Sequence, residues 1–280
     1  MLRGFYTAAS GMIAQQRRTE LLTNNMSNAN TPGYKSDQTS VRAFPEMLLN
    51  RMDTNAIPGK NGAGISSSQQ VGGLNTGVYI QDVSPLFSQG DLTETSLKTD
   101  VSLADGNMPI DEETGMRGTV LFTVQDEWGE LRYTRNGNFT LDADGYLTTA
   151  SGSYVLDSNN QRIQLDNDQY VINEEGVLSQ AGREDVRLGI AFSSNPYGQL
   201  EKEGDGLYRA AEGIVLPDAY NVNGADFSLK QGFLESSNVD ESKTMTEMMM
   251  AYRSFEANQK VLQAYDKSME KAVNEVGRIG

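Results

Sequence analysis

Apolar residues near the start of the chain recur at intervals of three, four and three residues. This spacing places them on one face of an α-helix. The pattern ends at Asn30-Thr31-Pro32-Gly33, where proline cannot continue a helix and glycine permits a reversal. We therefore expect residues 1–35 to form an N-terminal helix with its exit turn. The residues that define its apolar face are Leu2, Phe5, Ala9 and Met12.

The C-terminal region, residues 235–280, predicts a second and longer helix. Asn238 followed by Glu241 is typical of a helix start, with a polar cap and an acid three residues later. Apolar residues then follow a seven-residue repeat, which is typical of a helix that buries a long stripe against another helix. The two sets of repeat positions are Met245, Tyr252, Gln259, Asp266 and Val273, and Met248, Phe255, Leu262, Met269 and Val276.

These helices have two possible interpretations. Each could pack on the protein's own β domain, as most amphipathic helices do. Alternatively, the two could pair with each other or with neighbouring subunits, and we favour this because the repeat is too long for a small β core to cover. The predicted assembly interface consists of Leu2, Phe5, Ala9, Met12, Met245, Met248, Tyr252, Phe255, Leu262, Met269 and Val273.

Between the helices, the pattern changes twice. Residues 36–77 contain a stretch, 53–77, that is rich in Gly, Ser and Asn, so we expect an extended or flexible strap. It could be a surface loop or a strap that orders against a neighbouring subunit. Residues 78–234 are β-rich, with Asn136-Gly137 and Asp144-Gly145 as hairpin signals. A related strand–turn–strand pattern occurs at 141–147 and at 172–178.

Together these patterns predict an α+β fold. It would consist of a discontinuous, coiled-coil-like domain of N- and C-terminal helices plus a central antiparallel β domain. The longest apolar run is 248–252, far short of the ~20 residues that span a bilayer. The first residues do not form the apolar stretch of a cleavable signal peptide. We expect a protein that stays in the cytoplasm or is exported without cleavage, and that does not span a membrane.

The amino-acid composition excludes several kinds of catalytic and metal-binding site. The chain has no Cys and no His, which excludes disulfides, thiolate nucleophiles, His-based triads and His-ligated metals. The net charge is −15. Arg3, Arg17, Arg18 and Lys35 against Glu20 give residues 1–35 a charge of +3, which leaves −18 for the rest. Such a surface repels phosphate backbones, so we expect no nucleic-acid partner.

Four weak motifs do not predict a catalytic, cofactor or metal site. Gly62-Ala63-Gly64 lacks the third glycine of a dinucleotide loop. Asp142 and Asp144 fit a hairpin turn better than a calcium loop, which would need further ligands. Ser268 and Lys271 have the spacing of a hydrolase nucleophile and base but lie in the C-terminal repeat. The composition leaves one plausible class of enzyme, a glycoside hydrolase that would use two of the many carboxylates as its acid pair.

Three segments of the chain carry longer and more specific motifs. Residues 4–34 include Gly-Phe-Tyr-Thr-Ala-Ala-Ser-Gly-Met and end with Asn-Thr-Pro-Gly-Tyr. Residues 231–280 begin with Gln-Gly-Phe-Leu-Glu-Ser-Ser-Asn-Val at 231–239, and residues 133–139 read Tyr-Thr-Arg-Asn-Gly-Asn-Phe. These segments resemble the N-terminal motif, the C-terminal motif and the central hairpin of the flagellar basal-body rod and hook family.

This resemblance implies a structural subunit, most like the distal rod proteins, whose terminal helices pack into a tube that transmits torque. It implies signal-less export through the flagellar type III apparatus, an extracytoplasmic place in the basal body, and partners that include other copies and other rod or hook proteins. Residues 96–114 are more polar than the family pattern, so the outer domain could differ in shape. A carboxylate-based peptidoglycan hydrolase and a monomeric acidic β binding module are the alternatives.

Overall fold

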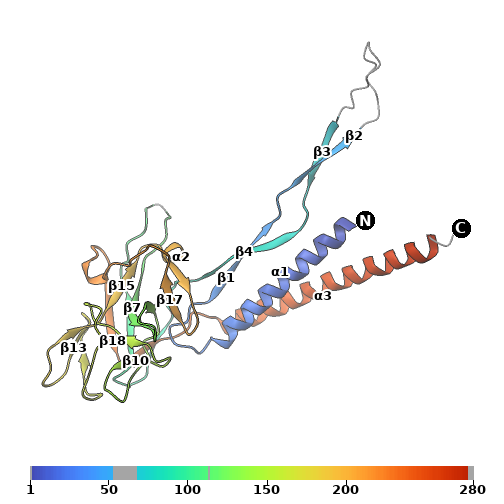
Figure 1. Cartoon of the computed structure of the whole chain (residues 1–280). Helices are drawn as coiled ribbons and strands as arrows, with labels where there is room; N and C mark the ends of the chain where they lie inside the picture. The colour runs from blue at the N-terminus through green and yellow to red at the C-terminus, as the bar shows by residue number, and fades with distance from the viewer. Residues whose placement is uncertain (1, 53–67, 113, 277–280) are drawn as a thin grey trace, which may run out of the picture. The chain divides into compact units, whose positions relative to one another are not determined.

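The computed structural model describes residues 2–52, 68–112 and 114–276 (Figure 1). The chain forms two compact units, each assembled from segments that are distant in the sequence. The helical unit contains Met1–Asn24, Gln38–Val83 and Ser242–Gly280. The β unit contains Asn25–Asp37 and Ser84–Glu241.

Two long helices dominate the helical unit. α1 covers Leu2–Ser27 and α3 covers Glu241–Lys271, with a π-helical turn at Ala272–Val276. Both lack proline, and α3 is rich in Glu, Lys, Met, Ala and Gln, which favour helix. The helices run antiparallel and side by side (Figure 1), since Gly4 lies against Tyr265 and Arg18 pairs with Glu247. The predicted pair of terminal helices is confirmed.

Strands occupy the described part of the predicted strap. β1 (Asp37–Ala43) pairs with β4 (Val78–Pro85). β2 (Met47–Met52) pairs antiparallel with β3 (Ser68–Leu74), from Met47 opposite Leu74 to Met52 opposite Ser68. Residues 53–67, which carry most of the Gly- and Ser-rich pattern, lie outside the described residues, and so does Gly62-Ala63-Gly64.

The β unit is built around an eight-stranded sheet. Its strand order is β16-β17-β8-β7-β11-β10-β9, and β15 also pairs with β7. Smaller sheets join β12-β13-β14, β18-β6 and β19-β5. The strands are β5 (Leu92–Glu94), β6 (Val101–Asp105), β7 (Thr119–Gln125), β8 (Leu131–Thr134), β9 (Phe139–Leu141), β10 (Leu147–Thr149), β11 (Tyr154–Val155), β12 (Val171–Ile172), β13 (Val177–Ser179), β14 (Val186–Arg187), β15 (Ile190–Ser193), β16 (Leu200–Lys202), β17 (Leu207–Ala210), β18 (Phe227–Gln231) and β19 (Phe233–Glu235). Short helices occur at Pro196–Gln199 (α2) and Ala219–Asn221.

β7 is the central strand of this unit, and both of its faces are buried. Phe122 and Val124 pack into the larger hydrophobic cluster, together with Phe139 and Leu229. Leu121 points the other way, into a second cluster with Tyr133, Tyr208 and Leu216. This explains why Thr-Val-Leu-Phe-Thr-Val is almost continuously apolar, because a strand covered on both faces needs no polar side. The predicted α+β fold with a central antiparallel β domain is confirmed.

The turn predictions had mixed outcomes. Asp144-Gly145 does connect a hairpin, in which Leu141 of β9 lies opposite Leu147 of β10 and Gly145 has a φ of 79°. The related pattern at 172–178 forms the β12-β13 hairpin, with a φ of 79° at Gly176. Glycine suits both turns because it alone adopts positive φ without strain.

The hairpin prediction at Asn136-Gly137 is wrong. β8 and β9 do not pair with each other, since β8 lies between β17 and β7 while β9 pairs with β10. Gly137 instead accepts a hydrogen bond from the backbone of Val101 at 3.0 Å, and a Cβ atom at this position would overlap the Val101 carbonyl oxygen. Glycine is needed here for close approach of two backbones rather than for a tight turn.

Candidate functional site

The contact between α1 and α3 follows a regular spacing. The buried or half-buried residues of α3 recur at intervals of four and three, which is the period of two helices packed in a coiled-coil manner. We call this line of residues the seam. It consists of Thr244, Met248, Ala251, Phe255, Asn258, Leu262, Tyr265 and Met269.

Small residues of α1 bring the two helices close together. Gly4 and Gly11 are seven residues apart and lie on the same face, with the buried Ala8 between them. A Cβ atom at Gly4 would overlap the hydroxyl of Tyr265, and one at Gly11 would lie 3.0 Å from Nδ2 of Asn258. Tyr265 therefore occupies space that a side chain at position 4 would take, and Asn258 packs tightly against Gly11, so these glycines favour a short distance between the helices.

The opposite end of the seam is fixed by polar contacts. Nη2 of Arg18 lies 3.1 Å from Oε2 of Glu247, and both side chains are partly exposed. The hydroxyl of Thr23 lies 3.8 Å from the sulfur of Met248. A partly exposed ion pair contributes little stability, but it specifies which side chains meet and so helps to fix the alignment of the helices.

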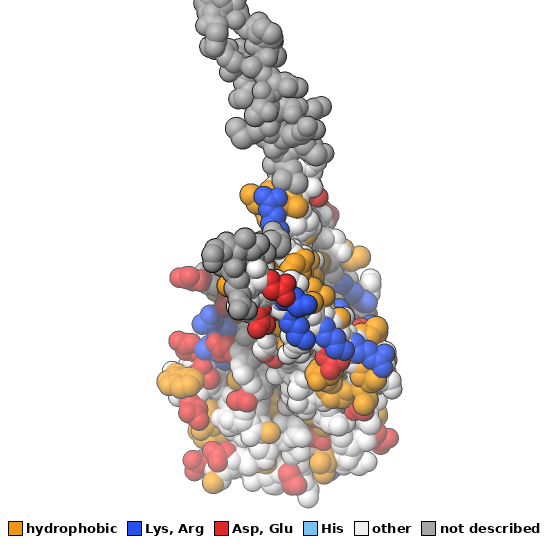
Figure 2. All heavy atoms as spheres, turned by 90° about the vertical axis from the view of Figure 1, so that its right-hand side faces the viewer, with side chains coloured by type: hydrophobic (Ala, Val, Ile, Leu, Met, Phe, Trp, Pro, Cys, Tyr) orange, Lys and Arg blue, Asp and Glu red, His pale blue; other side chains and the backbone are white. Residues whose placement is uncertain are grey.

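A second set of apolar side chains on these helices does not enter the seam. Its exposed fractions range from 44 to 73 %, which is high for large hydrophobic residues. We call this set the outer face, meaning the apolar surface outside the seam on both flanks of the helix pair. By helical periodicity, Met250 and Val261 lie on the other flank of α3 from Met245, Met249 and Tyr252. The set consists of Tyr6 and Ile13 on α1 and Met245, Met249, Met250, Tyr252, Val261 and Val273 on α3 and its end. In the face drawn in Figure 2, hydrophobic side chains lie exposed among charged ones.

A shallow hollow lies between the helices at the edge of this outer face. Its volume is about 470 Å³, and its walls are mainly apolar. Met248 belongs to the seam, whereas Met249 and Tyr252 belong to the outer face. Arg253 and Glu256 place one positive and one negative charge at the same hollow. It is lined by Thr19, Met248, Met249, Tyr252, Arg253 and Glu256.

The predicted interface residues divide between the seam and the outer face. Met248, Phe255, Leu262 and Met269 lie in the seam. Met245, Tyr252 and Val273 are exposed on the outer face. On α1, Phe5, Ala9 and Met12 are half-buried, and the side chain of Leu2 lies outside the described residues.

One of the two lines of repeat positions in the seam is shifted by one residue toward the N-terminus from the predicted line. It runs through Thr244, Ala251, Asn258 and Tyr265, whereas the sequence pattern assigned it to Met245, Tyr252, Gln259 and Asp266. In the first two repeats, the prediction favoured Met245 and Tyr252 because they are larger and more apolar than their neighbours Thr244 and Ala251. The close approach at Gly4 and Gly11 instead favours a line that begins with the small residues Thr244 and Ala251.

The family-like motifs include both helices and also meet at a largely buried polar cluster in the β unit. We call it the junction, and it consists of Asn25, Tyr34, Lys35, Arg135, Glu235 and Asn238. Sequence reasoning missed this cluster. The available signal was the position of charged residues beside apolar ones inside the motifs, as with Glu235 after Phe233 and Leu234.

Glu235 lies at the centre of the junction. Its Oε1 accepts from Nζ of Lys35 at 2.5 Å and from the backbone N–H of Gly90 at 2.9 Å. Its Oε2 accepts from Nε of Arg135 at 2.6 Å. Arg135 also lies 2.9 Å from Oδ1 of Asp105 and donates to the carbonyl of Val120. Both oxygens of the Glu235 carboxylate therefore have hydrogen-bond partners, which a buried charge requires.

The electrostatics of Glu235 follow from these neighbours. Burial disfavours the charged carboxylate, but the charges of Arg135 and Lys35 and their hydrogen bonds outweigh burial and lower the pKa of Glu235. For Lys35, burial and the like charge of Arg135 outweigh the attraction of Glu235 and lower its pKa. Glu235 is thus held ionised by two cations, which makes the cluster a structural ion network.

Two asparagines complete the junction. Oδ1 of Asn25 accepts from the hydroxyl of Tyr34 and from the N–H of Asp37, while Nδ2 donates to the carbonyl of Asp37. Oδ1 of Asn238 accepts from the N–H of Ser36, and its Nδ2 donates to the carbonyl of Leu86. The prediction that Asn238 caps the C-terminal helix is wrong, because its side chain instead joins separate parts of the β unit.

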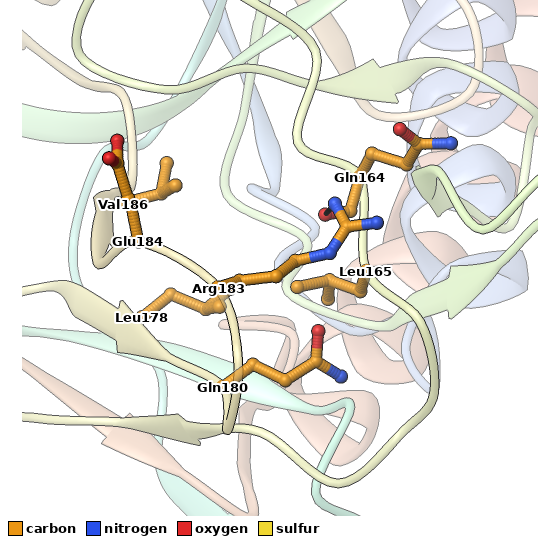
Figure 3. Close-up of a pocket in the computed structure, with 7 residues that line it drawn as sticks. All are labelled: Gln164, Leu165, Leu178, Gln180, Arg183, Glu184 and Val186. Atoms are coloured by element: carbon orange, nitrogen blue, oxygen red, sulfur yellow. Dashed lines mark hydrogen bonds between the residues drawn. The ribbon is translucent and has the colours of Figure 1, made fainter.

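The β unit has a further hollow of about 270 Å³ between residues 164 and 186 (Figure 3). Arg183 donates to the carbonyl of Gln164 and to Oδ1 of Asp166, both at 2.6 Å, and Glu184 points away from it. The arginine is therefore already satisfied within the chain. In the parts of the chain that the structure describes, no group of three or more acidic side chains is arranged to hold a metal ion.

The weak motifs have structural roles where they are described. Oδ1 of Asp142 accepts from the N–H of Ala143 within the β9-β10 turn. The hydroxyl of Ser268 donates to the carbonyl of Ala264 in its own helix, as surface serines in helices commonly do. Neither arrangement orients a nucleophile toward a base.

Comparison with known proteins covers the whole chain. Residues 5–35 match the flagella basal body rod protein model, 115–180 match the flagellar hook protein FlgE/F/G D1 domain, and 230–275 match the flagellar basal body rod FlgEFG protein C-terminal model. The hook-basal body complex protein FlhO of Bacillus subtilis is 46 % identical over 279 residues and covers 100 % of both chains.

Two more distant relatives are flagellar basal-body rod proteins. The basal-body rod protein FlgG of Bacillus subtilis is 30 % identical, over 98 % of this chain and 99 % of its own. The basal-body rod protein FlgF of Caulobacter vibrioides is 28 % identical over 100 % of both chains. With matching models at both ends and in the centre, and relatives that align over the full length, this chain belongs to the flagellar basal-body rod and hook protein family.

Proposed function

We propose that this chain polymerises through the outer face of its helix pair and so forms part of the torque-carrying rod. The family is one of structural, non-enzymatic subunits, which removes the hydrolase alternative. The observation that carries the proposal is that Met249, Tyr252 and Ile13 stay exposed although the α1–α3 seam is filled. The partner helix within the chain cannot cover them, so a neighbouring subunit is their natural contact.

The energy available on the outer face is large enough to drive assembly. Burying one Met, Ile or Tyr-sized apolar side chain contributes about 1.5–3 kcal/mol. Several such residues per subunit would decide between free and polymerised chains. The hollow beside Met249 and Tyr252 is large enough to accept a side chain from the neighbour. A contact in which a neighbour's side chain enters this hollow joins two different surfaces. Repetition of such a contact produces a ring or an open helical array rather than a closed dimer, and the tube that we propose is the helical case.

Torque transmission needs a firm link between the strand segments that carry load. The junction supplies this inside the β unit, where Lys35, Arg135 and Glu235 tie together segments that are 100 and 200 residues apart. We propose further that the chain assembles with other rod and hook proteins. Export through the flagellar type III apparatus without signal cleavage and an extracytoplasmic location in the basal body belong to the same proposal.

A matched pair of variants tests assembly through the outer face. Met249→Asp places a charge on the outer face, whereas Gln263→Asp makes a similar charge change at an exposed polar position of the same helix. We expect Met249→Asp to sediment as a monomer and to be absent from purified rods, with Gln263→Asp behaving as the unmodified chain. Equal assembly of both variants would show that the outer face is not the interface.

A further inference from the structure

The junction and the adjoining Asp105 together bury four charged groups at a single place in the β unit. The side chains of Lys35, Arg135 and Glu235 are 2, 1 and 1 % exposed, and that of Asp105 is 14 % exposed. Two positive and two negative groups balance one another. Since buried charges are stable only when paired, the balance depends on all four being present.

Glu235 is the member that the others cannot replace. Without its carboxylate, Lys35 retains a hydrogen bond to the carbonyl of Ser88 and the charge of Asp105, which Arg135 already engages directly. Arg135 retains Asp105 and the carbonyls of Val120 and Leu103. One buried cation then has no counter-charge, and removing one partner of a buried pair costs far more than the pair itself contributes.

Close backbone packing leaves little room for water to take the place of the carboxylate. A Cβ atom at Gly33, which has a φ of 68°, would lie 2.5 Å from the backbone carbon of Arg135. One at Gly90 would overlap the carbonyl oxygen of Ser236. The two glycines let the backbone segments of Lys35, Arg135 and Glu235 pack in contact, which fixes the geometry of the network.

The order of these residues along the chain determines the order in which they become available during synthesis. Lys35, Asp105 and Arg135 all precede Glu235, which ends β19. A chain that is made from its N-terminus presents both cations long before it presents the carboxylate that neutralises them. Most of the strands of the β unit also precede Glu235, so they become available while the junction is still incomplete.

We propose that Glu235 is a folding latch, which keeps the β unit from closing until the segment around residue 235 has arrived. Before that point, closing the sheets would bury an uncompensated cation. Once Glu235 is present, it locks the segment after α1 and the segment before α3 onto Arg135 in one step. The latch does not depend on the assembly surface, because all of its groups lie in the β unit.

Full-length variants test the electrostatic part of the latch. Glu235→Gln keeps the size of the side chain but removes its charge, and we expect the folding equilibrium of the β unit to fall by at least about 100-fold. The variant K35M/E235M removes one cation and one anion together, leaves Arg135 paired with Asp105, and should recover at least about tenfold of this loss. A Glu235→Gln chain as stable as the unmodified one, or no recovery in the double variant, would overturn the proposal.

Ribosome-bound chains test the timing. Synthesis of the chain is stalled at two lengths, with residues 1–232 or residues 1–240 outside the ribosome. The protease resistance of the β unit is then measured at each length. We expect resistance only at the longer length for the unmodified chain, and partial resistance already at the shorter length for Lys35→Met, which leaves Arg135 paired with Asp105. If the unmodified chain is resistant at the shorter length, or if Lys35→Met gains nothing there, charge does not time the folding and the latch is wrong.

Discussion

Lys35 and Glu235 are 200 residues apart in the sequence, yet Nζ of Lys35 lies 2.5 Å from Oε1 of Glu235 with both side chains buried. Lys35 follows α1 and Glu235 precedes α3, so the pair joins the two segments that lead to the terminal helices. Arg135 adds the centre of the sheet to this link through a 2.6 Å bond to the same carboxylate. The family-like motifs therefore meet at one point of the β unit.

Acid should weaken the β unit through Glu235. Its pKa is lowered in the folded state by Arg135 and Lys35, which outweigh the opposing effect of burial. The Glu235 carboxyl therefore takes up a proton at a higher pH in the unfolded chain than in the folded chain. The stability that Glu235 contributes is fully present above its ordinary pKa of 4.5 and is lost as the pH falls below that value.

Thermal unfolding as a function of pH measures this effect. We expect a melting temperature that is steady from neutral pH down to about 5 and then declines. Glu235→Gln should remove much of the acid slope, while Glu184→Gln, at an exposed position, should keep it. An identical slope in Glu235→Gln would mean that other carboxylates govern the acid response.

Asn25→Ala should destabilise the β unit by about 1–3 kcal/mol, the usual cost of leaving buried polar groups unpaired. Asn25 is 4 % exposed and bonds to both backbone groups of Asp37 and to the Tyr34 hydroxyl. Denaturant unfolding monitored by circular dichroism gives the change. The exposed Asn159→Ala serves as a control that should change stability by less than about 0.5 kcal/mol.

Gly4→Leu should force the helices apart, because any Cβ atom at this position overlaps the hydroxyl of Tyr265. We expect a loss of about 1–3 kcal/mol in the stability of the helix pair, typical of overpacking. The double variant G4A/Y265L removes the ring that a Cβ atom at residue 4 would overlap and should recover part of this loss, since alanine also favours helix over glycine. Helix melting followed by far-ultraviolet circular dichroism distinguishes the two variants. A G4A/Y265L melt as low as that of Gly4→Leu would refute the contact.

Phe255→Asp and Phe5→Asp should block assembly while leaving the β unit folded. Phe255 lies in the seam and Phe5 is half-buried on α1, so a charge at either position opposes helix packing. Limited proteolysis should show rapid digestion of the ends and an intact β unit. Normal rods and normal motility in cells that carry either variant would contradict this prediction.

The sequence predicted the elements whose signal is local. The helices follow from apolar spacing, and the hairpins at Gly145 and Gly176 follow from turn chemistry. It failed where a distant partner decides the outcome. Gly137 looks like a hairpin residue but serves a contact with Val101, and Asn238 looks like a helix cap but bonds to Ser36 and Leu86.

The same limit applies to the functional surfaces. The heptad pattern located the apolar residues of α3 but could not separate the seam from the outer face. That choice depends on Gly4 and Gly11 of the other helix, which admit Tyr265 and Asn258. The junction was missed because Lys35, Arg135 and Glu235 are individually ordinary charged residues, and only the fold brings them together.

Assembly through the outer face is tested most directly by quantitative mass spectrometry of purified hook–basal bodies. The particles are taken from cells that express either the unmodified chain or its Met249→Asp variant. We predict several copies of the unmodified chain per particle, at a fixed ratio to the other rod subunits, and none of Met249→Asp. Absence of the unmodified chain from intact particles, or incorporation of Met249→Asp at the same ratio, would contradict the account.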